Sequence, residues 1–201
     1  MDPVTTKLMS AAGAAAGPTY VDDVFSTDLS TGTSANKTIT NGIDLAGEGG
    51  MVWNKGRSHN HSNWLYDTER GANSGVRSNT ADAAHSDTEY FHSFNSDGYT
   101  IGSNGSLNYS GVTYATWTFR KCPGFFDVVT WTGNGVNGRQ ISHSLGSTPG
   151  CIFVKKTSDS ANWEVWHRSI GDNYFLRLNS TNAKNTSAPW NNTSPTSAHF
   201  T

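Results

Sequence analysis

The chain is poor in charged residues, cysteine and long apolar runs. Only 15% of its 201 residues are charged, and the formal net charge is −2 at pH 7. Such a chain lacks the basic surface through which proteins bind nucleic-acid phosphates, so we expect no nucleic-acid partner. No stretch approaches the ~18 consecutive apolar residues of a membrane-spanning helix, and we therefore expect no membrane insertion.

The chain has two cysteines, Cys122 and Cys151, each beside an apolar run. Two thiols with no histidine pair at ligand spacing do not make a zinc site. We expect two free thiols in or near a core rather than a disulfide. The sequence predicts no metal and no cofactor.

Small polar residues and aromatics dominate what is present. Ser (24), Thr (24), Asn (19) and Gly (21) make up almost half of the chain, a mixture that disfavours long helices. The 9 Phe, 7 Tyr and 7 Trp residues are too many for a disordered chain. The composition therefore predicts an all-β fold with short strands and many turns.

Runs of apolar and β-branched residues recur along the chain, separated by Gly and Asn turn signals. Short strands at this regular spacing are typical of a β-sandwich or jelly roll. The expected strands are 24–27, 38–40, 51–55, 63–67, 76–78, 91–95, 99–102, 114–120, 126–131, 140–142, 151–155, 163–167 and 174–178. One helical turn is expected at 79–85.

A repeat with an offset near 100 residues runs through the chain. The run Gly-Met-Val-Trp-Asn-Lys at 50–55 matches Gly-Cys-Ile-Phe-Val-Lys at 150–155. Gly71 likewise matches Gly171. Such self-similarity indicates a duplicated structural unit.

The repeat predicts a division into three parts. We expect an N-terminal anchoring segment at 1–17 and two tandem β-sandwich units at 18–122 and 123–201. The first unit includes a strand-like run at 114–120, whereas the second unit stops before the equivalent run. A sandwich without that strand has an open edge. Either the chain is a fragment of a longer one, which we favour, or a neighbouring subunit supplies the strand.

The segment 1–17 differs from the rest because it is rich in alanine and has a broken apolar run. Asp2 argues against a signal peptide. The segment is either a loose tail or a peptide that orders on a partner, and the sequence weighs these evenly. In the second case small residues allow close backbone approach and apolar side chains anchor in a groove. The predicted docking residues are Val4, Leu8, Met9 and Ala14.

Candidate catalytic and metal-binding groups have plainer explanations. Asp67 and Glu69 would share one strand face, but the repeat has His and Ser there, so a solvated edge is favoured over a glycosidase pair. His59 and His61 lie in a polar loop with no third ligand nearby, although a threefold assembly would bring such histidines together on its axis. No Gly-x-Ser-x-Gly elbow exists. We expect no enzymatic activity.

Tryptophan faces are the candidates for contact with sugar rings. Most tryptophans lie in expected strands, where burial in a core is the default for large aromatics. Trp190 lies in a loop-like context and is the tryptophan expected to be exposed. Trp64 is the second candidate for a glycan contact.

Several sequence blocks, taken in order, carry a resemblance to a known family. The blocks are 20–27, 41–53, 67–71, 93–98, 117–120 and 126–133. Over residues 18–201 the chain resembles a family of uncharacterised β-rich virion proteins of tailed phages, particularly phages of marine bacteria and cyanobacteria. The resemblance implies a tail-fibre or tail-appendage protein, with an N-terminal segment that fixes it to the tail.

We therefore expect a structural protein in the virion-proximal part of a phage tail fibre or tail appendage. It would be assembled in the host cytoplasm as a homotrimer, dock on a tail adaptor or nozzle protein through 1–17, and meet the host receptor only indirectly. The alternative is a carbohydrate-binding adhesin whose β units contact host glycan. A capsid decoration protein is also compatible with the sequence.

Overall fold

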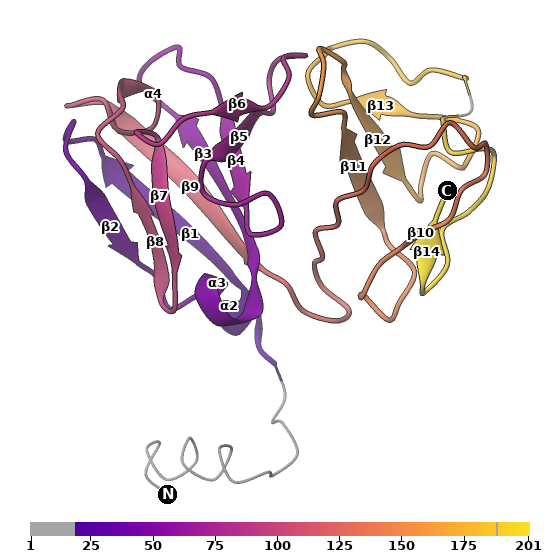
Figure 1. Ribbon diagram of the computed structural model, residues 1–201, viewed down its shortest axis with the longest axis horizontal. Helices are drawn as coiled ribbons and strands as arrows, with labels where there is room; N and C mark the ends of the chain where they lie inside the picture. The colour runs from indigo at the N-terminus through magenta and orange to yellow at the C-terminus, as the bar shows by residue number, and fades with distance from the viewer. Residues whose placement is uncertain (1–18, 188) are drawn as a thin grey trace, which may run out of the picture.

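The structure is a computed structural model that describes residues 19–187 and 189–201 (Figure 1). The chain is all-β: the described residues form antiparallel sheets and three one-turn helices, which confirms the predicted fold class. The helices are α2 (Val21–Val24), α3 (Leu45–Glu48) and α4 (Gly105–Asn108). The strands are β1 (Phe25–Thr31), β2 (Lys37–Thr40), β3 (Gly50–Gly56), β4 (Trp64–Asp67), β5 (Ser74–Arg77), β6 (His85–Ser86), β7 (Phe91–Asn95), β8 (Gly98–Ile101), β9 (Thr113–Arg120), β10 (Ile141–Ser142), β11 (Cys151–Lys155), β12 (Trp163–His167), β13 (Leu176–Arg177) and β14 (His199–Phe200).

The first unit is a β-sandwich. Its larger sheet has the order β1-β9-β3-β4-β5-β6, and its smaller sheet has the order β2-β8-β7. The two sheets face each other in Figure 1, and apolar side chains fill the space between them. The buried core consists of Ile43, Leu45, Val52, Trp64, Tyr66, Phe91, Tyr99, Ile101 and Leu107.

Local sequence sets how the chain enters β3. Asp44 begins α3, because its carboxylate accepts the N–H of Gly47 at 2.7 Å. Gly49 has a φ of 78°, which side-chain-bearing residues rarely adopt, and ends the turn. At Gly50 a Cβ atom would lie 2.1 Å from the carbonyl oxygen of Phe119 on β9. The glycine therefore allows β9 to pack closely along β3.

The second unit is built from two small sheets, β11-β12-β13 and β10-β14. Trp166 on β12, Phe175 and Trp190 form its buried core, and Ile152 and Val154 of β11 pack against them. Because successive side chains of a strand point to opposite faces, Ile152 and Val154 share the face of β11 that turns toward that core.

Strand pairing shows that the sequence repeat is a structural repeat. Between β3 and β4, Met51 lies opposite Asp67, and between β11 and β12, Cys151 lies opposite His167. Both members of the second pair lie 100 residues after those of the first. The β4–β5 and β12–β13 ladders keep the same offset. The duplication therefore preserves the register of a three-stranded meander.

The smaller sheets repeat in the same way, with slightly larger offsets. Ile39 of β2 lies opposite Tyr99 of β8, and Ile141 of β10 lies opposite Phe200 of β14. In both units the second of these strands follows the meander in the chain, so the order of elements is also repeated.

The second unit has no counterpart of β1 or β9 among the described residues. β3 lies between β9 and β4, whereas its repeat β11 is the edge strand of its sheet and pairs only with β12. This confirms the predicted open edge.

A shared apolar core joins the two units. It lies on the outer face of the larger sheet of the first unit, where Met51, Leu65 and Val76 are buried together with Trp163 of the second unit. Phe126 and Val128, from the segment that links the units, pack against the same cluster. Trp163 also donates its indole N–H to the carbonyl of Arg77 at 2.8 Å, so the contact has a fixed geometry.

Two expected elements are wrong. The run 126–131 is not a strand, because its apolar side chains cover the outer face of the first unit and only Phe126 makes an isolated bridge, with Cys122. The segment 79–85 has no helical turn. Asn79 instead accepts the backbone N–H of Asn63 at 2.9 Å, which ties its turn to the residue before β4.

Candidate functional site

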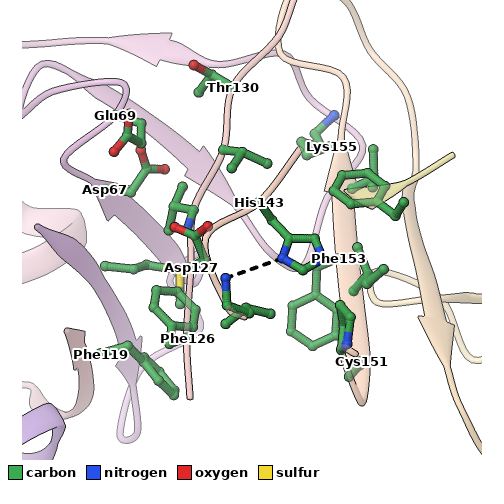
Figure 2. A pocket seen from close by; sticks show the side chains of 18 of the residues that line it. Asp67, Glu69, Phe119, Phe126, Asp127, Thr130, His143, Cys151, Phe153 and Lys155 are labelled. Atoms are coloured by element: carbon green, nitrogen blue, oxygen red, sulfur yellow. Dashed lines mark hydrogen bonds between the residues drawn. The ribbon is translucent and has the colours of Figure 1, made fainter. Parts of the chain in front are cut away.

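A cavity of about 1070 Å³ lies between the two units (Figure 2). One wall is the outer face of the larger sheet, a second is the linking segment 124–131, and a third is β11. The loop before β11 closes part of the rim with His143 and Leu145. The cavity is therefore bounded by both units and by the chain that joins them.

Aromatic side chains make much of this cavity apolar. Phe119 and Phe126 lie in tilted contact, with ring centroids 5.1 Å apart, on the side of the first unit. Phe153 lies on the opposite side, on β11, and is 44% exposed (Figure 2). Phe125 at the rim is also exposed. Exposed rings around one hollow are typical of a surface that binds an apolar or extended partner.

Asp67, one of the two acids at the end of β4, is held by Arg70. The Nη2 atom of Arg70 lies 2.6 Å from Oδ2 of Asp67, and the backbone N–H of Arg70 donates to Oδ1 at 2.9 Å. Arg70 also donates to the carbonyl of Ser74 at 2.9 Å. Asp67 is buried, so the expectation of a solvated pair is wrong for this residue. The ion pair closes the turn between β4 and β5.

Glu69 belongs to a second ionic group, centred on Lys121. The Nζ atom of Lys121 lies 2.6 Å from Oε1 of Glu69 and 3.5 Å from Oδ1 of Asp127. The hydrogen bond to Glu69 is the main cause that raises the pKa of Lys121. Asp127 also accepts the backbone N–H of Ser144 at 2.7 Å. These groups fix the linking segment on the first unit.

Lys155 and His143, which are also labelled in Figure 2, have hydrogen-bond partners as well. Lys155 donates to the carbonyls of Ala81 and Ala161 at 3.0 and 2.6 Å, and burial lowers its pKa. His143 accepts the backbone N–H of Leu145 at 3.3 Å through Nδ1. These contacts of Lys155 and His143 hold backbone and loop segments around the cavity in place.

β11 gives this cavity an unusual wall. Residues from both faces of the strand line the cavity: Cys151, Phe153 and Lys155 from one face, and Ile152 and Val154 from the other. A cavity that meets both faces of a strand must lie around its edge. Sequence reasoning did not single out Phe153 or Lys155, although a comparison of 151–155 with 51–55 points to both.

His59 and His61 lie apart from this cavity. Their rings stack with centroids 4.0 Å apart, and Tyr109 flanks them. Burial, and then the neighbouring His59, lowers the pKa of His61. In the described part of the chain no three His, Cys, Asp or Glu residues come together in a group that could hold a metal ion.

Both tryptophans predicted to contact glycan are buried. Trp64 is 1% exposed within the sandwich core, where Arg77 lies over its ring at 4.6 Å. Trp190 is 4% exposed and packs in the core of the second unit. The predicted exposure of Trp190 is wrong, and neither indole face is available to a sugar.

The two cysteines are free, as predicted. Cys122 is half-buried, but Cys151 is exposed at the start of β11 rather than in a core. The difference follows from the open edge of β11. The predicted docking residues Val4, Leu8, Met9 and Ala14 lie outside the described residues.

Comparison with known families covers both units. Residues 21–201 match a family described as a domain of unknown function, DUF7483. The chain belongs to the DUF7483 family. No curated protein and no solved structure matches the chain.

In this chain the DUF7483 match begins after the predicted anchoring segment 1–17 and includes every described strand. None of the helices that the structure describes has the length and apolar character needed to cross a membrane.

Proposed function

We propose that this DUF7483 chain is a structural virion protein, the virion-proximal part of a phage tail fibre or tail appendage. The observation that carries the proposal is the duplicated all-β unit whose two copies share one apolar core. A part that supports a receptor-binding end has to keep its length and direction under load. Two β-sheet units joined through a common core meet that requirement better than two domains on a loose linker.

Backbone hydrogen bonds between the units support the same role. The N–H of Ala84 donates to the carbonyl of Thr157 at 2.9 Å, and the N–H of Ala161 donates to the carbonyl of Ala81 at 2.8 Å. Together with the Trp163 indole bond and the Lys155 contacts, they join 77–84 to 155–163. Polar contacts of this kind fix the relative orientation of two packed surfaces.

The partners belong to the same proposal. Residues 1–17 dock on a tail adaptor or nozzle protein through Val4, Leu8, Met9 and Ala14, and the chain assembles as a homotrimer. The chain contacts the host receptor only indirectly, through the receptor-binding end that it supports. The adhesin alternative loses the two tryptophans predicted to contact glycan, because Trp64 and Trp190 are buried.

Particle composition and a substitution in the docking segment test the proposal. We expect peptides of the wild-type chain in gradient-purified phage particles by mass spectrometry. A variant with Val4, Leu8 and Met9 replaced by serine should fold with an unchanged circular dichroism spectrum and melting temperature, yet be missing from particles. The matched control replaces Thr5, Thr6 and Ser10 by alanine and should be incorporated normally.

Each part of the proposal has its own contrary outcome. Absence of the wild-type chain from particles rejects the virion assignment. Incorporation of the serine variant, or of a chain lacking 1–17, at wild-type copy number rejects the docking role alone. A monomeric mass by light scattering at micromolar concentration rejects the homotrimer.

A further inference from the structure

We propose that the open edge of β11 binds an extended strand from a partner polypeptide, in the position that β9 occupies on β3. The inference rests on the repeat and on the cavity, and it does not depend on the virion assignment. It defines a binding site for a peptide segment between the two units, in which β11 supplies backbone hydrogen bonds and the cavity walls receive side chains.

Backbone bonding in the first unit shows which groups of β11 are free to bind. The N–H of Lys121, which follows β9, donates to the carbonyl of Gly49 at 2.9 Å, whereas the N–H of Thr68, which follows β4, donates to the carbonyl of Gly50 at 3.0 Å. Antiparallel strands alternate in this way, so odd-numbered residues of β3 bond β9 and even-numbered residues bond β4.

In the second unit, β11 and β12 repeat the hydrogen-bonding pattern of β3 and β4. The N–H of Arg168 donates to the carbonyl of Gly150 at 3.0 Å. Even-numbered residues of β11 therefore bond β12, and the backbone groups of Cys151, Phe153 and Lys155 point to the open edge. These are the groups whose counterparts in β3 bond β9.

Gly150 repeats the glycine at which β9 closely approaches β3 in the first unit. Its counterpart Gly50 must be glycine because of the carbonyl of Phe119 on β9. Around Gly150 the nearest atoms to an added Cβ belong only to the side chain of Arg168, and the residue has no φ that favours glycine. The second unit thus retains the small residue although no described strand lies against it.

The size and walls of the cavity favour a single extended segment. Its volume of about 1070 Å³ is at the upper end of the ~300–1,000 Å³ typical of small-molecule pockets, so it has room for a short extended segment. The first unit and the linking segment bound it on two sides, so we expect it to receive a single strand rather than the folded face of a second copy. β11 is five residues long and so pairs with a segment of similar length.

The side chains around the edge define the chemistry of the partner. In the first unit Thr116 and Thr118 of β9 lie opposite Asn54 and Val52. The corresponding residues of β11 are Val154 and Ile152, so the partner presents β-branched or other apolar residues on this face. On its other face it places aromatic or aliphatic side chains beside Phe153.

A synthetic peptide with the sequence of β9, Thr-Tyr-Ala-Thr-Trp-Thr-Phe-Arg, is the probe. It is titrated into the full chain and followed by fluorescence anisotropy. N-methylation of the residue equivalent to Trp117 removes an N–H that faces the edge and should weaken binding at least tenfold. N-methylation at the position of Thr118 removes an N–H that faces away and should change binding less than twofold. No binding, or equal effects of the two methyl groups, overturns the proposal.

Hydrogen exchange locates the bound peptide. We expect slower amide exchange at Cys151, Phe153 and Lys155. Slower exchange only in β3 would mean that the peptide displaces β9 from the first unit, and it would overturn the proposal.

Phe153→Pro removes an edge-facing N–H without removing a bond to β12 and should weaken binding at least tenfold. If this variant does not fold, the two N-methylated peptides still test whether the peptide forms backbone hydrogen bonds with the edge of β11.

Disulfide exchange with Cys151 tests the register in a Cys122→Ser background. Because Met51 lies opposite Phe119, a peptide with an activated disulfide at the position of Phe119 should react with Cys151 at least tenfold faster than one with it at the position of Ala115. Equal rates, or a preference for the second peptide, overturn the β9-like register.

Discussion

At the scale of single residues, the turn around Trp190 shows how a side chain in a polar loop becomes buried. Asn191 and Asn192 both have positive φ values, 50° and 51°, a conformation that asparagine tolerates better than most residues. The tight turn leaves Trp190 facing Trp166 and Phe175. The indole therefore contributes to the core of the second unit.

Trp190→Ala should lower the free energy of unfolding by about 3–5 kcal/mol, the cost of deleting a large buried aromatic. Trp131→Ala is the matched control, since this tryptophan is 40% exposed, and it should cost clearly less. Urea unfolding measures both variants. Equal costs would contradict the burial of Trp190.

The buried tyrosines Tyr66 and Tyr99 make stability depend on pH in the alkaline range. Burial is the main cause that raises the pKa of both phenols above the usual value of 10. A pKa that is higher in the folded than in the unfolded chain gives stability that is present below pH 10 and is lost as the pH rises.

We therefore expect the free energy of unfolding to fall between pH 10 and 12, and Tyr66→Phe to reduce that fall. Urea unfolding at a series of pH values measures the slope. At pH 7 the variant should differ little from wild type, because the Tyr66 hydroxyl forms no hydrogen bond with any residue that the structure describes. A slope identical to that of wild type would contradict the assignment.

At the scale of elements, the linking segment 124–131 covers an apolar face of the first unit although it does not form a strand. Phe126 and Val128 cover the outer face of β3, β4 and β5, so their apolar side chains are satisfied by packing rather than by a ladder. The ionic group of Glu69, Lys121 and Asp127 holds the start of the segment in place. The same local pattern of apolar residues is therefore compatible with a strand in a sheet and with an irregular segment that covers a core.

Phe126→Ala should destabilise the chain by about 2 kcal/mol, because a half-buried ring leaves the shared core. Phe125→Ala is the control, since the neighbouring ring is 41% exposed and should contribute less than half as much. Chemical unfolding followed by tryptophan fluorescence compares the two. A larger effect at Phe125 would contradict the packing described for the linking segment.

At the scale of the whole molecule, the two units differ in how far each can stand alone. The first unit closes a core between two sheets of its own. The second has a smaller core, an edge strand open to the cavity, and Trp163 buried against the other unit. The second unit therefore depends on the first for part of its burial.

We expect residues 19–122 expressed alone to fold and to self-associate, since Met51, Leu65 and Val76 would be uncovered. Residues 123–201 alone should show no cooperative thermal transition. Circular dichroism melting and light scattering test both fragments. A sharp transition in the second fragment would show that its own core suffices.

Some features could be predicted from the sequence alone because they depend on residue composition and on the internal duplication of the chain. The richness in Ser, Thr, Asn, Gly and aromatics specified an all-β chain, and the offset of 100 residues located a duplication whose register the strands keep. Repeating a pattern of alternating residues repeats the faces that it buries. The open edge of β11 was predicted for a different reason, because no run within 123–201 repeats the strand at 114–120.

Tertiary structure decided which surfaces meet. It buried Trp190 and Trp64, paired Asp67 with Arg70, and turned an expected strand at 126–131 into the covering of a shared core. It also placed a cavity at the edge of β11. These outcomes depend on contacts between residues far apart in the chain, and periodicity records only that a side chain is apolar, not which distant surface removes it from water.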